Sequence, residues 1–501
     1  MASMAAMIRA LLFSASLALL PLSASAQNAA ATPAAAPAPA VPQAEIAAVM
    51  QQWMAAAPVP GLAYGVVKDG RLIASGALGV QDLQDRRPVT PQTRFRIASM
   101  TKAFTAYAIL TLAAEGKLRL DDPISRHVRE TRNWAGPITV ADLLHHTAGF
   151  VTDDPWGDRQ QPMTEADFTR LISQAPAFST PPRTRYEYSN YGYALLGRIV
   201  AEASDQDYAV FVRLRILAPL GMNDTTFEVG LVEDAVLARP YRWENGAWSA
   251  EPSMAHGAFG AMGGLVTTQA DYAKWVAHLL SAWPARAEEP VSSRVVRDMA
   301  RGEGFLHSRR RPGKDAPDCR LSAVYAAGLV AADDCLLGRV LLHGGGYPGY
   351  GSFMLLMPDA GVGVFAFTNE TYAGPSPPVW DAAGLLKRAG LAESRAIAVS
   401  PALASAYAAA GRIWSAGSIE GEGSALAMNM PLDRAPEAWA RELATLKAQA
   451  GVCETTSAIT PSGALAGRFR WTCARGAIDG TLLLAPTQTP QIQALSFARA
   501  P

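Results

Sequence analysis

The stretch RIASMTKAF, residues 96–104, places a serine and a lysine three positions apart, Ser99 and Lys102, where a helix is expected to begin. Residues at this spacing lie on one face of a helix, one turn apart. A lysine in that place can accept the serine's proton if burial or a neighbouring cation lowers its pKa. The same spacing arises by chance in long chains, so an ordinary helix cap with a surface lysine is the alternative.

Residues 1–26 have the composition of a secretory signal peptide. Arg9 precedes the apolar run ALLFSASLALLPL, and Ala24 and Ala26 form a small-x-small cleavage site. A membrane anchor is the alternative, but the run is short for a bilayer span. Residues 27–42 are rich in alanine and proline, which predicts an extended tether. We therefore expect a secreted or periplasmic protein that has no transmembrane anchor once the signal peptide is removed.

The charge balance of the chain is neutral. Lys plus Arg and Asp plus Glu number 44 each, and 50% of the 501 residues are hydrophobic. Such a composition can build two or three globular domains with sizeable cores. Without a net positive charge or a basic stripe, nothing attracts the chain to nucleic acid or to an anionic membrane. We therefore expect no nucleic-acid partner, and the sequence leaves the oligomeric state open.

Four cysteines follow the predicted signal peptide: Cys319, Cys335, Cys453 and Cys473. An oxidising compartment favours two disulfides, and four cysteines allow three pairings. The local pairing, Cys319–Cys335 with Cys453–Cys473, is the most natural because each pair brackets an apparent strand turn. Each bridge would then stabilise the fold by about 3 kcal/mol. A metal site is the weaker alternative, since no Cys-x-x-Cys spacing occurs.

Strand patterns occur at both ends of a long first domain, residues 43–395. Two strands flank a Lys-Asp-Gly turn at 68–70, and four more lie between about 320 and 370. Together they predict an α/β fold with one mostly antiparallel sheet, flanked by helices, and an inserted helical region at about 120–300. A ligand cleft is expected between sheet and helical region. Residues 396–501 predict a separate small α+β domain with two helices and two or three strands.

Two further motifs come from different parts of this plan. The only Tyr-x-Asn in the chain, formed by Tyr188 and Asn190, lies at a turn before a helix of the helical region. The only His-x-Gly, formed by His343 and Gly345, ends an apolar strand. Its glycines would let a ligand backbone approach closely. Each motif alone is weak, because a capped turn or a strand-end histidine would look the same.

In this order, Ser-x-x-Lys, Tyr-x-Asn and His-x-Gly resemble the penicillin-recognising serine hydrolases, specifically the class C β-lactamase-like group. The segments GKLRLDDPI, LLHHTAGF, LGMNDTTF and GGLVTTQADYAKW are also similar to that group. The resemblance covers about residues 43–395 and implies a β-lactamase/transpeptidase-like fold there. The group includes D-Ala-D-Ala carboxypeptidases, D-aminopeptidases and carboxylesterases. It implies a hydrolase that needs neither a metal nor another cofactor.

The resemblance implies a role for each residue of the first two motifs. Ser99 would attack the substrate carbonyl and become acylated. Lys102 and Tyr188 would share the proton transfers, with the tyrosine as general base and as acid to the leaving group. Asn190 would hydrogen-bond Lys102 and the substrate amide or ester.

The resemblance also implies the roles of the third motif. The backbone N–H groups of Ser99 and Gly346 would form the oxyanion hole, beside Gly345. His343 would add a polar or positive wall that orients the tyrosine or a substrate carboxylate. The β-lactamases carry Lys-Thr-Gly at this motif, whereas here Gly344 replaces the hydroxyl and a histidine replaces the cation. Both changes weaken the binding of a substrate carboxylate, because histidine is largely neutral at pH 7 at its ordinary pKa.

We therefore expect an exported enzyme that cleaves ester or small amide and peptide bonds through an acyl-enzyme on Ser99. A β-lactamase or D-Ala-D-Ala carboxypeptidase that acts on cell-wall material is one alternative. A catalytically silent protein that binds cell wall or peptide is another, with the small C-terminal domain as its binding module. In each case the partner is a small molecule or a peptide.

Five other residues could carry chemistry but have simpler interpretations. His145 and His146 stand at the end of a helix before Thr-Ala-Gly, which predicts a structural turn. Asp153 and Asp154 lie in a segment rich in proline, glycine and aspartate, which predicts a solvated loop. Trp471 is expected in the core of the small C-terminal domain.

Overall fold

The computed structural model describes residues 39–134, 136–284, 290–311, 320–395 and 397–500. The expected signal peptide, residues 1–26, and nearly all of the expected tether lie outside the described residues, so both stay predictions. Within the described ranges, no helix is both long and apolar enough to cross a membrane.

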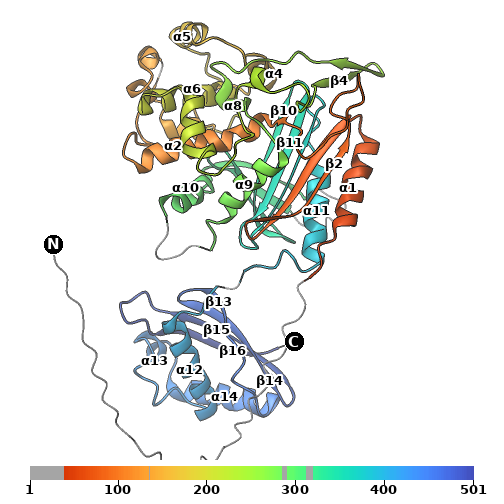
Figure 1. The fold of residues 1–501 in the computed structure, drawn as a ribbon. Coiled ribbons are helices and arrows are strands. Elements are labelled where there is room, and N and C mark those ends of the chain that lie inside the picture. Colours follow the sequence, from red (N-terminus) through yellow and green to blue (C-terminus); the bar gives the residue numbers. More distant parts are fainter. Residues whose placement is uncertain (1–38, 135, 285–289, 312–319, 396, 501) are drawn as a thin grey trace, which may run out of the picture. The chain divides into compact units, whose positions relative to one another are not determined.

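One eight-stranded sheet carries the main part of the chain, and every neighbouring pair of its strands is antiparallel. The strand order is β2-β1-β12-β11-β10-β9-β8-β7 (Figure 1). The strands are β1 (Gly61–Lys68), β2 (Arg71–Gly79), β7 (Gly304–Arg310), β8 (Arg320–Tyr325), β9 (Val330–Asp334), β10 (Gly338–Tyr347), β11 (Tyr350–Met357) and β12 (Val362–Thr368). The N-terminal hairpin thus pairs with β12 from the far end of the domain, which confirms the predicted antiparallel sheet.

Two features of this sheet differ from the prediction. The segment SAVYAAGLVAA, residues 322–332, is one of the four strands expected between about 320 and 370, but it forms the β8–β9 hairpin, with Gly328 at a positive φ of 69° in the turn. Strand β7 pairs with β8 at the edge of the sheet, although no strand was expected there. Its sequence, GFLHSRR, is mostly polar and partly exposed, as edge strands often are, and therefore carries little strand signal.

The central strands send alternate side chains into two separate cores. In β1, Leu62, Tyr64 and Val66 join one core, whereas Ala63 and Val67 join the other. Successive side chains of a strand point to opposite faces, so a strand buried on both sides feeds both cores. The flanking helices are α1 (Gln43–Ala56) and α11 (Ser376–Arg388) on the first face and α9 (Gln269–Leu280) on the second.

The inserted region and the segments next to it consist mainly of helices, together with two small pairs of strands. The helices are α2 (Lys102–Ala114), α3 (Val140–Leu144), α4 (Asp154–Arg159), α5 (Glu165–Ser173), α6 (Asn190–Ser204), α7 (Tyr208–Val212), α8 (Gly260–Gly263) and α10 (Val291–Met299). The paired strands are β3 (Phe95–Arg96) with β6 (Val266–Thr267) and β4 (Tyr241–Glu244) with β5 (Ala247–Ala250). Thr139 and Asp142 form a capping box at the start of α3, and Thr268 caps α9 by accepting the Asp271 N–H. These caps fix where the helices begin.

The C-terminal part has its own core, whose buried members all lie between residues 403 and 497. Its helices and strands are α12 (Pro401–Ala416), α13 (Asn429–Asp433), α14 (Pro436–Ala450), β13 (Thr460–Gly463), β14 (Ala466–Cys473), β15 (Gly476–Leu484) and β16 (Ile492–Arg499). The four strands form one antiparallel sheet, one strand more than the largest number expected. Trp471 is fully buried in this core, as expected.

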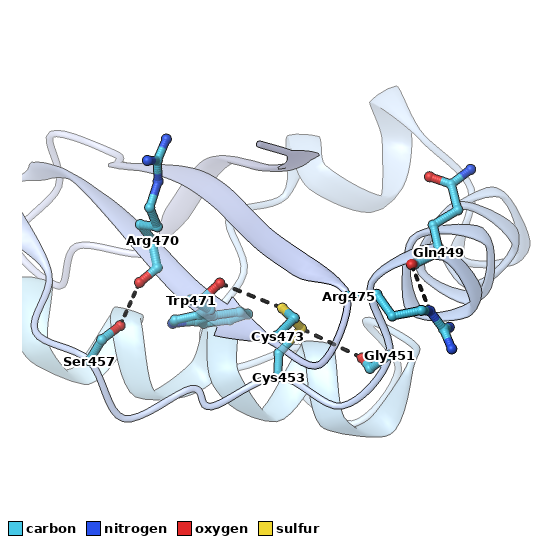
Figure 2. Close-up of a disulfide and its surroundings, with 8 residues drawn as sticks. All are labelled: Gln449, Gly451, Cys453, Ser457, Arg470, Trp471, Cys473 and Arg475. Atoms are coloured by element: carbon cyan, nitrogen blue, oxygen red, sulfur yellow. Dashed lines mark hydrogen bonds between the residues drawn. A yellow bond between two sulfur atoms is a disulfide. The ribbon is translucent and has the colours of Figure 1, made fainter. Parts of the chain in front are cut away.

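A disulfide joins Cys453 and Cys473 in this C-terminal part. Figure 2 shows it between the segment that follows α14 and the end of β14, close to Trp471. This is one half of the local pairing expected from the sequence. Cys319 lies outside the described residues, so the pairing of Cys319 with Cys335 stays a prediction.

Candidate active site

A short 3-10 turn, Ala98–Thr101, carries Ser99 into α2. The Ser352 hydroxyl on β11 donates to the Ile97 carbonyl at 2.7 Å and ties this turn to the sheet. Ala98 takes a positive φ of 49°, a left-handed conformation that costs energy in any residue with a Cβ. Ser99 itself is only 7% exposed. The predicted nucleophile therefore sits in a strained turn that its surroundings hold in place.

The Lys102 side chain ends among three oxygen atoms. Its Nζ lies 3.0 Å from the Ser99 Oγ, 2.7 Å from the Asn190 Oδ1 and 2.9 Å from the Met262 carbonyl oxygen. The amide and backbone oxygens can only accept, so they take the two N–H bonds of a neutral amine. The lone pair of that amine then faces the Ser99 hydroxyl, which can donate. The first predicted pair is thus arranged for proton transfer from serine to lysine.

Burial lowers the pKa of Lys102 to about 8, because the wholly buried ammonium group loses its hydration. The charges of Asp154, Asp158 and Asp153 act in the opposite direction. A proton acceptor works best when its pKa lies near the working pH. The environment of this lysine therefore suits a general base far better than a surface position would.

The second motif approaches Lys102 from the N-terminus of α6, where Ser189 provides the capping hydroxyl. Asn190 is the first residue of the helix, and the Tyr188 ring centroid lies 4.8 Å from the Lys102 Nζ. Burial and the nearby Asp154 raise the pKa of Tyr188 well above its ordinary value, although its interaction with the Ser99 side chain acts in the other direction. The Tyr188 phenol is therefore neutral at physiological pH.

The third motif lies on β10, directly beside the nucleophile turn. A Cβ on Gly345 would collide with the Ser352 hydroxyl and with the Ile97 carbonyl, so only glycine fits there. This close approach of β10 places Gly346, the next residue, at the turn that carries Ser99. The structure thus brings together all three motifs, which are far apart in the sequence.

His343 is buried, and its contacts suit the polar rather than the positive form of the expected wall. Its Nδ1 lies 2.6 Å from the Gly344 carbonyl, and its Nε2 lies 3.1 Å from the Tyr325 hydroxyl. Because a carbonyl can only accept, Nδ1 carries the proton and Nε2 accepts from the tyrosine. Burial, together with the charge of Lys102, lowers the pKa of His343 to about 4. Its ring packs beside Tyr188, with 6.4 Å between centroids.

His146, expected only as part of a turn, contacts the second motif directly. Its Nδ1 accepts the Ser189 N–H at 3.0 Å. Its ring centroid lies 4.4 Å from those of both Tyr188 and Tyr325. The histidine therefore links the second motif to the Tyr325–His343 pair. In the sequence, only the double histidine in LLHHTAGF pointed to a role for His146 in the site. Its neighbours in space come from distant parts of the chain.

The prediction of a solvated loop around Asp153 was wrong. Asp153 accepts hydrogen bonds from the N–H groups of Asn190 and Tyr191 at 2.6 and 2.9 Å. Its negative charge there complements the positive end of the α6 helix dipole. On α4, Asp158 is 2% exposed and lies 3.3 Å from the Asn190 Nδ2, and Asp154 lies 3.1 Å from the same atom. The local composition looks like a loop because the partners of these carboxylates come from α6.

The chain is similar to several known proteins. The sequence profile of the family described as Beta-lactamase matches residues 46–388. Protein flp from Staphylococcus aureus (strain MW2) is 34% identical over 192 residues, which cover 37% of this chain and 38% of that protein. Penicillin-binding protein 4* from Bacillus subtilis (strain 168) is 26% identical over 304 residues, 58% of this chain and 64% of that protein. The chain thus matches less than two thirds of the length of either relative.

A solved structure has the same fold. The octameric penicillin-binding protein homologue from Pyrococcus abyssi matches with a TM-score of 0.61 at 22% identity. The match covers 91% of this chain and 95% of the other. The fold is therefore β-lactamase/transpeptidase-like, as the resemblance in sequence implied.

Proposed function

Since this chain belongs to the Beta-lactamase family, we propose that it is a serine hydrolase that forms an acyl-enzyme on Ser99. The observation that carries the proposal is the Lys102 amine, fully buried and 3.0 Å from the Ser99 Oγ. Its other two hydrogen-bond partners are the oxygen acceptors of Asn190 and Met262. A chance Ser-x-x-Lys at a helix start would leave the lysine in solvent, without these partners.

In the proposed reaction, the Ser99 hydroxyl proton passes to the neutral Lys102 amine as the Oγ attacks the substrate carbonyl carbon. The electron pair of the carbonyl moves onto its oxygen, which accepts from the N–H groups of Ser99 and Gly346. Collapse of this intermediate expels the leaving group, which takes a proton from the site. Water then attacks the acyl group by the same route and restores the free serine.

Lys102 suits the role of base better than Tyr188. The pKa of Lys102 is lowered to about 8, so a substantial share of the amine is neutral near pH 8. The pKa of Tyr188 is instead raised well above its ordinary value. A tyrosine that keeps its proton is suited to donate it to the leaving group. We therefore assign the base to the lysine and the acid to the tyrosine, whose phenolate recovers the proton held by the Lys102 ammonium before water attacks.

We propose that the substrate is an ester or a small amide or peptide. A β-lactam or a D-Ala-D-Ala peptide presents a carboxylate, which needs a cation or hydroxyl in the third motif. Here His343 is neutral and bonded inside the protein, and Gly344 has no side chain. The complete set of catalytic side chains favours an enzyme over a silent binding protein. Export is proposed on the N-terminal sequence alone.

A substrate panel tests this proposal. The wild type should hydrolyse p-nitrophenyl acetate more efficiently than nitrocefin or a D-Ala-D-Ala peptide. Ser99→Ala and Lys102→Met should both lose ester turnover. Lys274→Met, which removes an exposed lysine on α9 outside the site, should retain it. Strong nitrocefin turnover by the wild type would show that a neutral third motif still accepts a carboxylate and would favour the β-lactamase alternative.

A further inference from the structure

A tyrosine on the sheet side of the site reaches a carboxylate on the helical side. Tyr372 lies in the loop after β12, and its hydroxyl donates to the Asp158 Oδ2 on α4 at 2.9 Å. The tyrosine is 47% exposed, whereas the aspartate is buried. Burial raises the pKa of Asp158 to about 7, while the charge of Lys102 and the tyrosine hydrogen bond act the other way. This contact, the Tyr372–Asp158 bridge, spans the two halves of the site.

Both ends of the bridge lie against residues of the proposed machinery. A Cβ on Gly346 would lie 2.7 Å from the Tyr372 Cδ1, so the tyrosine ring covers the proposed oxyanion residue. At the other end, the Asp158 Oδ1 lies 3.3 Å from the Asn190 Nδ2, and the same amide accepts from the catalytic lysine. These contacts therefore connect Ser99, through Lys102, Asn190 and Asp158, to Tyr372, which is the most exposed residue among them.

The backbone at Tyr372 is held in a strained conformation. Its φ is +58°, in the left-handed region that residues with a Cβ rarely adopt. Its N–H lies 3.3 Å from the carbonyl oxygens of both Tyr347 and Tyr350, at the end of the β10–β11 hairpin. Strain of this kind persists where surrounding contacts enforce it, and it concentrates at ligand clamps. The hairpin that ends in the third motif thus sets the position of the tyrosine ring.

We infer that the Tyr372–Asp158 bridge limits the space for a substrate's acyl group beside Gly346 and thereby selects substrates with a small acyl group. The inference rests on the proposed function. In the proposed reaction the carbonyl oxygen is held at Gly346, against which the Tyr372 ring lies, and the leaving group lies toward Tyr188, which supplies its proton. The acyl group, on the other side of the carbonyl carbon, then lies next to the bridge. A short acyl group leaves the bridge intact. A longer one has to displace the tyrosine and break its hydrogen bond.

Two esters with the same leaving group, p-nitrophenyl acetate and p-nitrophenyl hexanoate, test the inference. Their ratio of kcat/KM reports only on the acyl group. Tyr372→Gly removes the ring, and glycine tolerates the positive φ without added strain. We expect this variant to raise the hexanoate-to-acetate ratio about tenfold or more relative to the wild type, because one excluded methylene group alone can change selectivity by that factor. Tyr372→Phe keeps the ring but loses the hydrogen bond and should raise the ratio less.

Trp156→Ala provides the matched control, because Trp156 is an aromatic residue of similar exposure, 46%, on the same helix as Asp158. Its ratio should equal that of the wild type. An unchanged ratio in both Tyr372 variants, with a fluorophosphonate still labelling Ser99, would overturn the inference and leave the proposed function intact. No labelling and no ester turnover in the wild type would overturn the function, and the inference with it.

Discussion

At Lys102, the length of one side chain and the burial of its end determine what the residue can do. The spacing of Ser99 and Lys102 was readable from the sequence, because helix geometry alone places them on one face. The lowered pKa was not readable, because burial depends on α6 and α8, which come from elsewhere in the chain. At this scale the sequence predicts which residues meet, and the fold determines their protonation.

The pKa of Lys102 predicts how activity depends on pH. The neutral amine is the base, and the folded-state pKa lies near 8, below the ordinary value of 10.5. The kcat/KM for p-nitrophenyl acetate should therefore rise with pH through about pH 8 and then level off. A pH–rate profile checks this. Activity that is already maximal at pH 6 would exclude a lysine base with this pKa.

His146 should act by positioning the second motif. His146→Phe keeps a ring but cannot accept the Ser189 N–H, so Tyr188 and Asn190 lose part of their support. We expect kcat to fall by up to about a hundredfold with little change in KM, since small displacements of catalytic groups cost that much. His146→Asn, which restores an acceptor near the Nδ1 position, should recover much of the loss.

His278→Phe is the control for this experiment, because it removes a partly buried histidine that packs against Tyr107 and Trp275, away from the second motif. Its kcat should match the wild type. If kcat and the melting temperature fell equally in His146→Phe and His278→Phe, His146 would contribute only to packing.

At the scale of elements, β10 and the nucleophile turn meet because Gly345 has no side chain. Gly345→Ala should push β10 away from the turn and lower ester turnover by about a hundredfold. Gly344→Ala is the matched neighbour, because its added Cβ would come no closer than 3.4 Å to any atom beyond its chain neighbours, the nearest being in the Phe353 ring. Steady-state kinetics should separate the two variants. Equal activity in both would mean that the close approach at Gly345 is unimportant for the site.

The elements also show what a sequence can and cannot predict. Strands such as β11 and β12 were readable because buried apolar residues run through them. The β8–β9 turn was missed because Ala326, Ala327 and Leu329 surround its one glycine with apolar residues. The burial of Asp153 was missed because its partners are backbone N–H groups of α6, a long-range pairing that no local pattern encodes.

At the scale of the whole molecule, the proposed catalytic residues lie between Ser99 and Gly346, whereas the disulfide lies in the C-terminal core. The double variant Cys453→Ser/Cys473→Ser should lower the free energy of unfolding of the C-terminal part by about 3 kcal/mol, because the bridge closes a short loop. Calorimetry measures this loss. Ester turnover at low temperature should not change; if it fell with the bridge removed, the C-terminal part would contribute to the active site.

The central claim is that Ser99 becomes acylated, and trapping the intermediate tests it most directly. The wild type is incubated with a fluorophosphonate or a slowly hydrolysed ester, digested, and mapped by peptide mass spectrometry. The adduct mass should appear on the peptide that contains Ser99 and should be missing from Ser99→Ala treated in the same way. An adduct on a different residue, or one that persists at full yield in Ser99→Ala, would contradict the account.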